Sequence, residues 1–296
     1  MNQPLHDLVS IIVIGHNGGK YLGGALSSAI GQTWPSTEVI YVDDGSTDDS
    51  IAIASGFNRI RILTQRQSGI SAARNAGAHA SAGDFLVFLD HDDLLELNAV
   101  ESAMECFHAN PAAAFVFGRA RLIDTEGQPF RARFPVHPVD EPDLFLALLK
   151  GGNACHSICP PAVVTFRREK FLSSGGFRAR FMPAEDYDLY LRISREHECC
   201  SYPQETVNYR IHHGNISKDV LNLLSACQRV ISWHYESALP DPLVETAYRQ
   251  GTQYWRRYWL GRLPVQAVQQ IRNRQFKKFA YSLAAIFLKH PLSIWY

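Results

Sequence analysis

The sequence predicts an α/β protein with a doubly wound, mainly parallel central sheet that is flanked by helices and followed by a C-terminal helical extension. Short runs of β-branched and aromatic residues alternate with helix-like segments over residues 1–95, which is the pattern of strand–helix–strand units. After residue 217 the pattern is mainly helical. At 296 residues, of which 46% are hydrophobic and 20% charged, the chain is long enough to bury a large core.

The expected strands of the first part are short apolar runs. Residues 9–14 (VSIIVI) are continuously apolar, which is typical of a strand buried on both faces. The helices expected between strands have apolar side chains at helical spacing. The further strands and helices of this part are expected, in chain order, at residues 20–30, 38–42, 60–63, 70–80 and 85–89.

The alternation loosens after residue 95. Asn98 and Glu101 have the spacing of a capping box, which predicts a helix that ends near residue 108. Later strands are expected at residues 113–123, 129–134, 163–166 and 206–211. Later helices are expected at residues 143–150, 169–173 and 185–195.

Polar and acidic residues follow the carboxyl ends of the expected strands, where open parallel sheets bind ligands. The first strand is followed by Gly15-His16-Asn17, the second by Asp43-Asp44 and the fourth by a run of acids. Neither the glycine pattern of a dinucleotide-binding fold nor that of a phosphate-binding P-loop is present. The sequence therefore predicts a ligand site at one edge of the sheet that uses neither of these glycine motifs.

The segment FLDHDD places Asp90, Asp92 and Asp93 directly after an apolar run. Because like charges this close repel, a cation is expected beside them. Carboxylate oxygens are the ligands that Mg²⁺ and Mn²⁺ prefer, and such an ion binds diphosphate oxygens. The alternative is that Asp92 or Asp93 caps a helix, with Glu96 completing a capping box. The two roles are compatible, because different carboxylates can serve each.

Several segments, in order, resemble the motifs of glycosyltransferase family 2. They are VSIIVIGHN, SSAIGQTWPSTEVIYVDDGSTDDS, GISAARNAGAHASAGDFLVFLDHDD, GGF with AEDYDLYLRIS, and YRIHHGNIS. The resemblance is dense over residues 9–95 and returns over residues 163–217. It implies the GT-A fold, a nucleotide-sugar donor, a divalent cation and inversion of the anomeric centre.

The resemblance also implies a domain organisation. Residues 1–217 would form the catalytic domain, with a nucleotide-sugar half at about residues 1–95 and an acceptor half at about residues 96–217. Residues 218–296 would form a helical, basic C-terminal extension.

The resemblance assigns binding roles residue by residue. It places Asp44 on the base of the nucleotide, with Asp43 beside it, and Arg74 near the nucleotide. Asp90 and Asp92 match the D-x-D motif, with Asp92 expected to make the more direct metal contact and Asp90 also lying at the donor.

The first loop departs from the family pattern. The family usually has Pro-Thr-Tyr-Asn after the first strand, whereas this chain has Ile14-Gly15-His16-Asn17. Gly15, His16 and Asn17 are still expected to bind the donor, with His16 in place of the aromatic residue that packs on the base. His16 as an ordinary loop residue is the alternative.

The acceptor side of the resemblance supplies the base. Inverting transfer needs a group that takes the proton of the acceptor hydroxyl, and the motif assigns this role to Asp186. Gly176 would lie near the donor sugar, and His212 is a further candidate metal ligand. The secondary candidates are Glu185, Asp93 and Arg210.

From the residues alone, structural interpretations of these positions stay open. Residues 43–50 fit a solvated turn and helix cap, and Arg74 fits the surface of an amphipathic helix. Acids after Pro183 favour a helix N-terminus through its dipole. Gly176 fits a helix C-cap, and His212 fits a structural role after a strand.

The function implied is an inverting, metal-dependent glycosyltransferase that uses Mn²⁺ or Mg²⁺. It would move a sugar from a nucleoside diphosphate donor, UDP- or dTDP-linked, to a hydroxyl of a saccharide or lipid-linked saccharide in cell-surface polysaccharide biosynthesis. One alternative is a catalytically degenerate sugar-nucleotide-binding or scaffold protein, and another is a nucleotidyltransferase.

The tail at residues 249–296 has nine Lys or Arg residues, no Asp or Glu, and many aromatic residues. Its segment FAYSLAAIFL is too short to span a bilayer but fits the bilayer interface, so contact with the inner-membrane surface is expected. The alternatives are packing on the catalytic domain or a homodimer partner. No motif supports nucleic-acid binding.

The start of the chain and its cysteines indicate the compartment. The first residues, MNQPLHD, have no secretory signal pattern, and no apolar run has the length of a membrane span. The six cysteines do not have the spacing of a disulfide scaffold and are expected to be reduced. We therefore expect a cytoplasmic protein, with peripheral attachment to the cytoplasmic face of the membrane as the further option.

Overall fold

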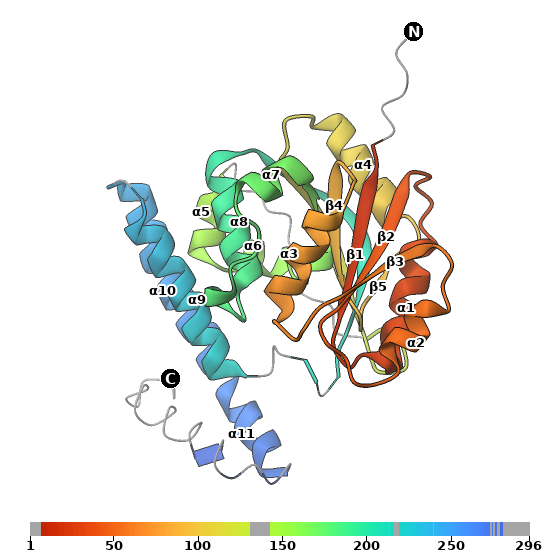
Figure 1. Ribbon diagram of the computed structural model, residues 1–296. Helices are drawn as coiled ribbons and strands as arrows, with labels where there is room; N and C mark the ends of the chain where they lie inside the picture. The colour runs from red at the N-terminus through yellow and green to blue at the C-terminus, as the bar shows by residue number, and fades with distance from the viewer. Residues whose placement is uncertain are drawn as a thin grey trace.

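The computed structural model describes residues 7–130, 143–212, 214, 215, 219–238, 240–272, 274, 276, 279 and 280. Over these residues the chain forms an eight-stranded sheet in the order β3-β2-β1-β4-β7-β6-β8-β5, covered by helices (Figure 1). The expected fold class, a mainly parallel α/β sheet with C-terminal helices, is confirmed.

The first part of the sheet is parallel and places β1 between β2 and β4. The pairing sets Gly15 opposite Asp43 and Ile14 opposite Asp90, so the carboxyl ends of the three strands meet at one edge. The strands of this part are β1 Val9–Gly15, β2 Thr37–Asp43, β3 Ile60–Thr64 and β4 Phe85–Asp90.

The helices of this part lie on the two faces of the sheet. Right-handed crossovers that step outward from β1 to β3 place α1 (Gly19–Ile30) and α2 (Ser50–Ser55) on one face, and the return to β4 places α3 (Ile70–Ala80) on the other (Figure 1). Helix α3 crosses close to β1, because a Cβ at Gly77 would lie 2.3 Å from Ile12 Cγ2.

The second part of the sheet contains antiparallel pairs. Strand β7 (Val164–Arg167) runs antiparallel to β4 and to β6 (Phe115–Ile123). Strand β8 (Cys199–Arg210) pairs parallel with β6 and antiparallel with β5 (Leu94–Leu95). The strand expected at residues 206–211 is thus the end of a longer strand. Of the strand expected at residues 129–134, Pro129 forms an isolated bridge to Ile123, and residues 131–134 lie outside the described residues.

Two expected caps do not form. Helix α4 (Ala99–Ala109) begins after Asn98 without a side-chain capping bond, because Glu101 accepts a hydrogen bond from Thr33 Oγ1 at 2.7 Å instead. No helix follows Asp93 directly either, since the next residues form β5. The helix-cap interpretation of the acidic segment is therefore wrong.

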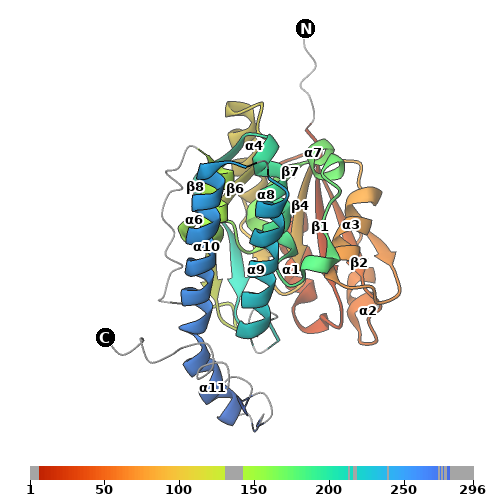
Figure 2. The same cartoon turned by 90° about the vertical axis from the view of Figure 1, so that its left-hand side faces the viewer.

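The remaining helices cover the second part of the sheet and one flank of the molecule. Helices α9 and α10 lie side by side on that flank, and α11 continues beyond the end of α10 (Figure 2). In chain order the elements are α5 Leu144–Lys150, α6 Asn153–Ser157, η1 Pro161–Val163, α7 Arg168–Ser173, η2 Ala179–Phe181, α8 Glu185–Glu196, α9 Val220–Glu236, α10 Pro242–Leu260 and α11 Leu263–Arg272.

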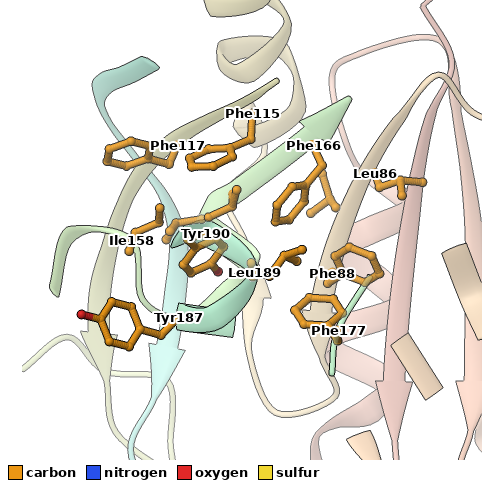
Figure 3. Close-up of a cluster of buried hydrophobic side chains, with 14 of the residues drawn as sticks. Leu86, Phe88, Phe115, Phe117, Ile158, Phe166, Phe177, Tyr187, Leu189 and Tyr190 are labelled. Atoms are coloured by element: carbon orange, nitrogen blue, oxygen red, sulfur yellow. The ribbon is translucent and has the colours of Figure 1, made fainter. Parts of the chain in front are cut away.

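An aromatic core fixes α8 to the sheet (Figure 3). Phe88 of β4 contacts Phe166 of β7 edge-on at 5.9 Å, and Tyr190 of α8 stacks on Phe166 at 6.1 Å, measured between ring centroids. All three are fully buried, and each of the two Phe side chains contributes about 1.5–3 kcal/mol through burial alone. The first turn of α8, which carries Glu185 and Asp186, is therefore held against a rigid aromatic core.

Helix α10 packs on the rest of the protein through residues of the tail for which membrane contact was expected. Trp255 is 5% exposed, and its Nε1 donates to Tyr187 Oη at 3.3 Å. A Cβ at Gly251 would lie 2.0 Å from the Leu149 carbonyl oxygen, so α10 crosses α5 at very close range. None of the helices in the described part of the chain has the length and hydropathy to cross a membrane. The domain boundary at residue 217 stays a prediction.

Candidate active site

The loops after β1, β2 and β4 are tied to one another at the carboxyl edge of the sheet. The backbone N–H of Asp44 donates to the carbonyl of Gly15 at 2.9 Å, and that of His91 donates to the carbonyl of Ile14 at 3.0 Å. A side chain on Gly15 would meet His91 Cβ at 3.1 Å. The residues expected to bind the donor therefore lie beside the acidic segment.

Asp43 shapes the turn that follows β2. Its Oδ2 accepts from the backbone N–H groups of Gly45 and Ser46 at 3.1 and 2.9 Å, and its Oδ1 accepts from Tyr41 Oη at 3.0 Å. It is 3% exposed. Burial and the nearby Asp43 charge both raise the pKa of Tyr41 well above its usual value, so this hydroxyl stays protonated as a donor.

Asp44 holds the segment between β3 and α3. Its Oδ1 accepts from Gln65 Nε2 at 2.7 Å and from the Ser68 N–H at 2.8 Å, and its Oδ2 accepts from the Gly69 N–H at 2.8 Å. Because a carboxylate offers about four lone-pair positions, these three donors leave roughly one for a further partner. Asp43 and Asp44 are thus more than a solvated turn.

His16 has a defined tautomer in this geometry. Its Nδ1 lies 3.0 Å from the Asp44 carbonyl oxygen; since a carbonyl only accepts, Nδ1 carries the proton. Its Nε2 then accepts from Asn17 Nδ2 and Gln67 Nε2 at 3.1 and 3.2 Å. Asn17 has a left-handed φ of 53°, and its Oδ1 accepts from the Thr47 N–H at 2.8 Å.

The acidic segment forms a carboxylate cluster. Oxygens of Asp90, Asp92 and Asp93 all lie within 4.8 Å of one another. Asp93 is 1% exposed; its Oδ1 accepts from the Arg210 N–H at 2.9 Å, and its Oδ2 has no partner among the described residues. Burial, then Asp92 and Asp90, raise the pKa of Asp93 well above its usual value. An all-oxygen set with two partly exposed carboxylates fits a hard divalent cation.

Arg74 joins this cluster to helix α8. Its side chain is 3% exposed, with Nη2 donating to Asp90 Oδ1 at 2.9 Å and Nη1 donating to Glu185 Oε1 at 2.8 Å. The guanidinium lies 5.1 Å from the centre of the Phe177 ring. The surface-residue interpretation of Arg74 is therefore wrong, because the residue is a buried link between two carboxylates.

The three acids in the first turn of α8 have different surroundings. Glu185 is paired with Arg74, whereas Asp186 accepts only from the N–H of Tyr187, at 2.7 Å, among the described residues. Burial and the neighbouring Glu185 charge raise the pKa of Asp186 to about 7, against the opposing effect of Arg74. Asp186 is thus the acid of this turn that is poised to exchange a proton near neutral pH.

Asp188 is fully buried and has cationic and imidazole partners. Its oxygens accept from Arg178 Nε at 2.8 Å, Arg192 Nε at 3.1 Å and His234 Nε2 at 3.1 Å. Although burial opposes ionisation, the hydrogen bonds from His234 and Arg178 and the charge of Arg192 lower the pKa of Asp188 to about 2. Asp188 lies within the AEDYDLYLRIS segment, but the sequence gave no sign of these partners, of which His234 lies 46 residues away along the chain.

The end of β8 is tied to the acidic cluster. The Gly214 N–H donates to His212 Nδ1 at 3.0 Å, so the proton is on Nε2, which donates to Asp92 Oδ2 at 2.7 Å. Arg210 Nε donates to the Asp92 carbonyl at 2.9 Å. His212 and Arg210 thus orient Asp92. His213 lies outside the described residues.

Gly176 fits the C-cap interpretation of the GGF segment, and its expected position near the donor sugar stays a prediction. Its N–H donates to the Phe171 carbonyl at 3.2 Å, which closes the end of α7, and its φ is 64°. Asn75 clamps the next residue, accepting from the Phe177 N–H at 2.9 Å and donating to the Phe177 carbonyl at 2.8 Å. Sequence reasoning missed Asn75, although it directly follows Arg74 in the segment GISAARNAGAHASAGDFLVFLDHDD.

The family of this fold and site follows from comparison with known proteins. The profile described as Glycosyl transferase family 2 matches residues 10–171, which is more than half of the 296-residue chain. The chain therefore belongs to glycosyltransferase family 2.

Two relatives are similar to this chain over only part of their own length. An uncharacterized glycosyltransferase of Rickettsia conorii is 29% identical over 76% of this chain and 38% of its own length. The chondroitin synthase of Escherichia coli is 31% identical over 63% of this chain and 26% of its own length. This chain thus spans well under half the length of either relative.

Two solved structures share the fold. Residues 1–349 of Staphylococcus aureus TarS, in complex with UDP-GlcNAc, superpose with a TM-score of 0.69 over 96% of this chain and 82% of that one, at 16% identity. The mannosyltransferase PcManGT of Pyrobaculum calidifontis, in complex with GDP-Man and Mn²⁺, superposes with a TM-score of 0.62 over 93% and 80%, also at 16% identity.

Replacing Asp188 by Asn should destabilise the protein in a pH-dependent way. Because the pKa of Asp188 is lowered to about 2 from an ordinary 3.8, its ionised form contributes about 2 kcal/mol at neutral pH. This contribution is complete above about pH 5 and is lost as the pH falls toward 2. Urea unfolding at pH 7 and pH 3 measures it. Asp84→Asn, an exposed acid, is the control, and an equal loss of stability at both pH values would contradict the account.

Proposed function

We propose that the protein transfers a sugar, with inversion, from a nucleoside diphosphate sugar to a hydroxyl of a saccharide or lipid-linked saccharide in cell-surface polysaccharide assembly. One observation carries the proposal: Arg74 links Asp90, in the acidic cluster, to Glu185, in the turn that presents Asp186. Family membership supports the transfer chemistry, and the chondroitin synthase relative supports a saccharide product.

The donor base would bind at the loop formed by Gly15, His16, Asn17 and Asp44. The remaining lone pair of Asp44 accepts an N–H of uracil or thymine, and the partly exposed His16 ring offers a face for stacking. The UDP-GlcNAc bound by TarS supports a uridine donor, whereas the GDP-Man bound by PcManGT makes guanosine the competitor to test.

The donor diphosphate would lie at the carboxylate cluster. Asp90 and Asp92 would hold Mn²⁺ or Mg²⁺, with His212 and Arg210 keeping Asp92 in place. The chemistry supplied by the bound ion is neutralisation of the charge that the diphosphate leaving group gains. Arg74 also pairs with the carboxylate of Glu185, so Glu185 adds no unpaired negative charge near the diphosphate.

Asp186 would be the general base. Its carboxylate takes the proton of the acceptor hydroxyl as that oxygen attacks the anomeric carbon opposite the departing diphosphate. A pKa of about 7 suits this role, because a base works best when its pKa lies near the operating pH. Gly176, without a side chain, would leave room for the donor sugar.

The alternatives differ in product. A nucleotidyltransferase releases pyrophosphate, a glycosyltransferase releases nucleoside diphosphate, and a scaffold protein releases neither. The protein is incubated with UDP-, dTDP- and GDP-sugars, Mn²⁺ and candidate acceptors, and in parallel with the matching nucleoside triphosphates, Mn²⁺ and a sugar 1-phosphate. Separating the products distinguishes the three, because pyrophosphate can leave only from a nucleoside triphosphate. Release of pyrophosphate, or of nothing with any donor, would overturn the proposal.

Asp186→Asn should abolish transfer and leave donor binding intact. An amide cannot take the acceptor proton, so the rate should fall by about 10²–10⁴-fold, while the donor contacts around Asp44 are untouched. Transfer rates and calorimetric donor affinity measure the two effects. Asp84→Asn serves as the control, and retention of transfer by the Asp186 variant would assign the base elsewhere.

The pH dependence of transfer should show a single acidic limb. Because the base must be ionised and the pKa of Asp186 is raised to about 7, kcat/KM should rise about tenfold per pH unit below that pH and level off above it. Initial rates from pH 5 to pH 9 measure the profile. A limb centred near 4 would mean that an ordinary carboxylate is the base.

Asp92→Asn should remove the effect of metal on donor binding. Losing one carboxylate from the cluster removes a charged ligand for the ion, so donor binding in the variant should be the same with and without Mn²⁺. Thermal shifts with each nucleotide sugar, with and without the ion, measure this. Asp48→Asn, an exposed acid in the loop after β2, is the control; full metal enhancement in the Asp92 variant would place the ion elsewhere.

The inner-membrane surface would be contacted through α11 rather than α10. Val265, Val268 and Ile271 of α11 are 62%, 50% and 46% exposed, whereas Trp255 of α10 is buried. A basic tail adds roughly 1 kcal/mol for each charge placed near anionic lipid. A lipid-linked acceptor would account for this exposed face.

Replacing Val265 and Ile271 together by Ser should weaken flotation with anionic liposomes, because apolar area and charge act together in interfacial binding. Leu243→Ser is the matched control, since Leu243 is also exposed, at 65%, but lies at the start of α10. Flotation with anionic and with neutral vesicles, at low and high salt, measures binding. Equal flotation of all variants, or none by the native protein, would end the membrane proposal.

A further inference from the structure

The side chain of His234 reaches from the C-terminal helix α9 to the first turn of α8. It is 2% exposed, and its Nε2 lies 3.1 Å from Asp188 Oδ1. Since a carboxylate accepts, Nε2 carries the proton and donates. Its Nδ1 is buried with no partner among the described residues, so the ring makes one side-chain hydrogen bond, and that bond goes to α8.

The other contacts of Asp188 hold the GGF segment. Arg192, one turn further along α8, donates to Asp188 and to the carbonyls of Ser174 and Gly176. Arg178 donates to both oxygens of Asp188. These hydrogen bonds are made by residues outside α9, so they would survive the loss of the His234 side chain.

Helix α9 is joined to α8 by a second hydrogen bond. Arg195 Nη2 donates to the carbonyl oxygen of His234 at 2.9 Å. Helix α9 packs on α8, α10 and the Ala179–Phe181 turn. The elements that carry Asp44 and the Asp90–Asp93 cluster lie in the N-terminal half of the sheet.

We propose that His234 is a positioning residue for glycosyl transfer: through Asp188 it fixes the first turn of α8, and with it the carboxylate of Asp186. This inference rests on the proposed function. It makes α9 a working part of the catalytic unit, so the unit extends past the boundary that the sequence predicts at residue 217.

The contacts predict which kinetic constant changes. Displacing a catalytic group by about 1 Å can cost about 100-fold in rate, and Asp186 lies two residues before Asp188 on the same helical turn. In the described part of the chain no hydrogen bond joins α9 to Asp44 or to the Asp90–Asp93 cluster, which would hold the base and the diphosphate of the donor. Loss of the His234 hydrogen bond should therefore lower kcat and leave donor affinity unchanged.

Four variants test the role. The Gln side chain can present an N–H donor near the position of Nε2, so His234→Gln should keep kcat within a few-fold of native. The Asn side chain places its amide nearer Nδ1, where there is no partner, so His234→Asn should behave like His234→Leu, with kcat lowered by about 10–100-fold. Val230→Ala is the packing control, since it removes buried volume from α9 but no hydrogen bond to α8.

Four measurements on the full chain complete the experiment: kcat for transfer, donor affinity by calorimetry, Tm, and amide exchange of α8. The expected result is low kcat in the Leu and Asn variants, native-like kcat in the Gln variant, and unchanged donor affinity throughout. Val230→Ala should lower Tm without lowering kcat. Amide exchange of α8 should rise in the Leu variant and not in the Gln variant.

Several results would overturn the inference. One is that the Gln and Leu variants have equal kcat, and another is that Val230→Ala lowers kcat as well as Tm. The others are that donor affinity falls together with kcat, or that the amide exchange of α8 does not change in the Leu variant. If the native protein transfers sugar and all His234 variants have the same kcat as the native protein, only the positioning role fails. If the native protein releases no nucleoside diphosphate with any donor, the proposed function fails first.

Discussion

The buried guanidinium of Arg74 is the interaction on which the rest of the site depends. Burial alone would lower its pKa, but Asp90 and Glu185 raise the pKa above its usual value, so the charge is retained. A buried charge of this kind is costly unless it is paired and hydrogen-bonded. Asp90 lies at the end of β4 and Glu185 at the start of α8, so the pairing fixes the distance between the two halves of the site.

Charge pairing also separates the roles of the three acids in the first turn of α8. Glu185 is neutralised by Arg74, Asp188 is ionised among its cationic and imidazole partners, and Asp186 is left with a pKa raised to about 7. Carboxyl groups of similar intrinsic acidity thus differ because of what each one faces. The usual favourable effect of a helix N-terminus on acids applies to all three and does not distinguish them.

Local sequence patterns predicted most of the sheet, because an apolar run flanked by turn residues has few other ways to bury itself. They failed where a distant partner intervened. Glu101 does not cap α4, because Thr33 offers it a hydroxyl. Strand β8 begins at Cys199, well before the apolar pattern indicates, because pairing with β6 supplies backbone hydrogen bonds to polar residues as well.

By itself the sequence determined the fold class, the edge of the sheet where the site lies, and its acidic, all-oxygen character, since these follow from the order of short-range patterns along the chain. Only the tertiary structure decided which carboxylates are paired, which one keeps a raised pKa, and that a histidine of a C-terminal helix reaches α8. The physical reason is that pKa values and hydrogen-bond partners depend on distances of a few ångströms between residues far apart in sequence, such as Arg74 and Glu185 or Asp188 and His234. Periodicity and motif spacing carry no information about those distances.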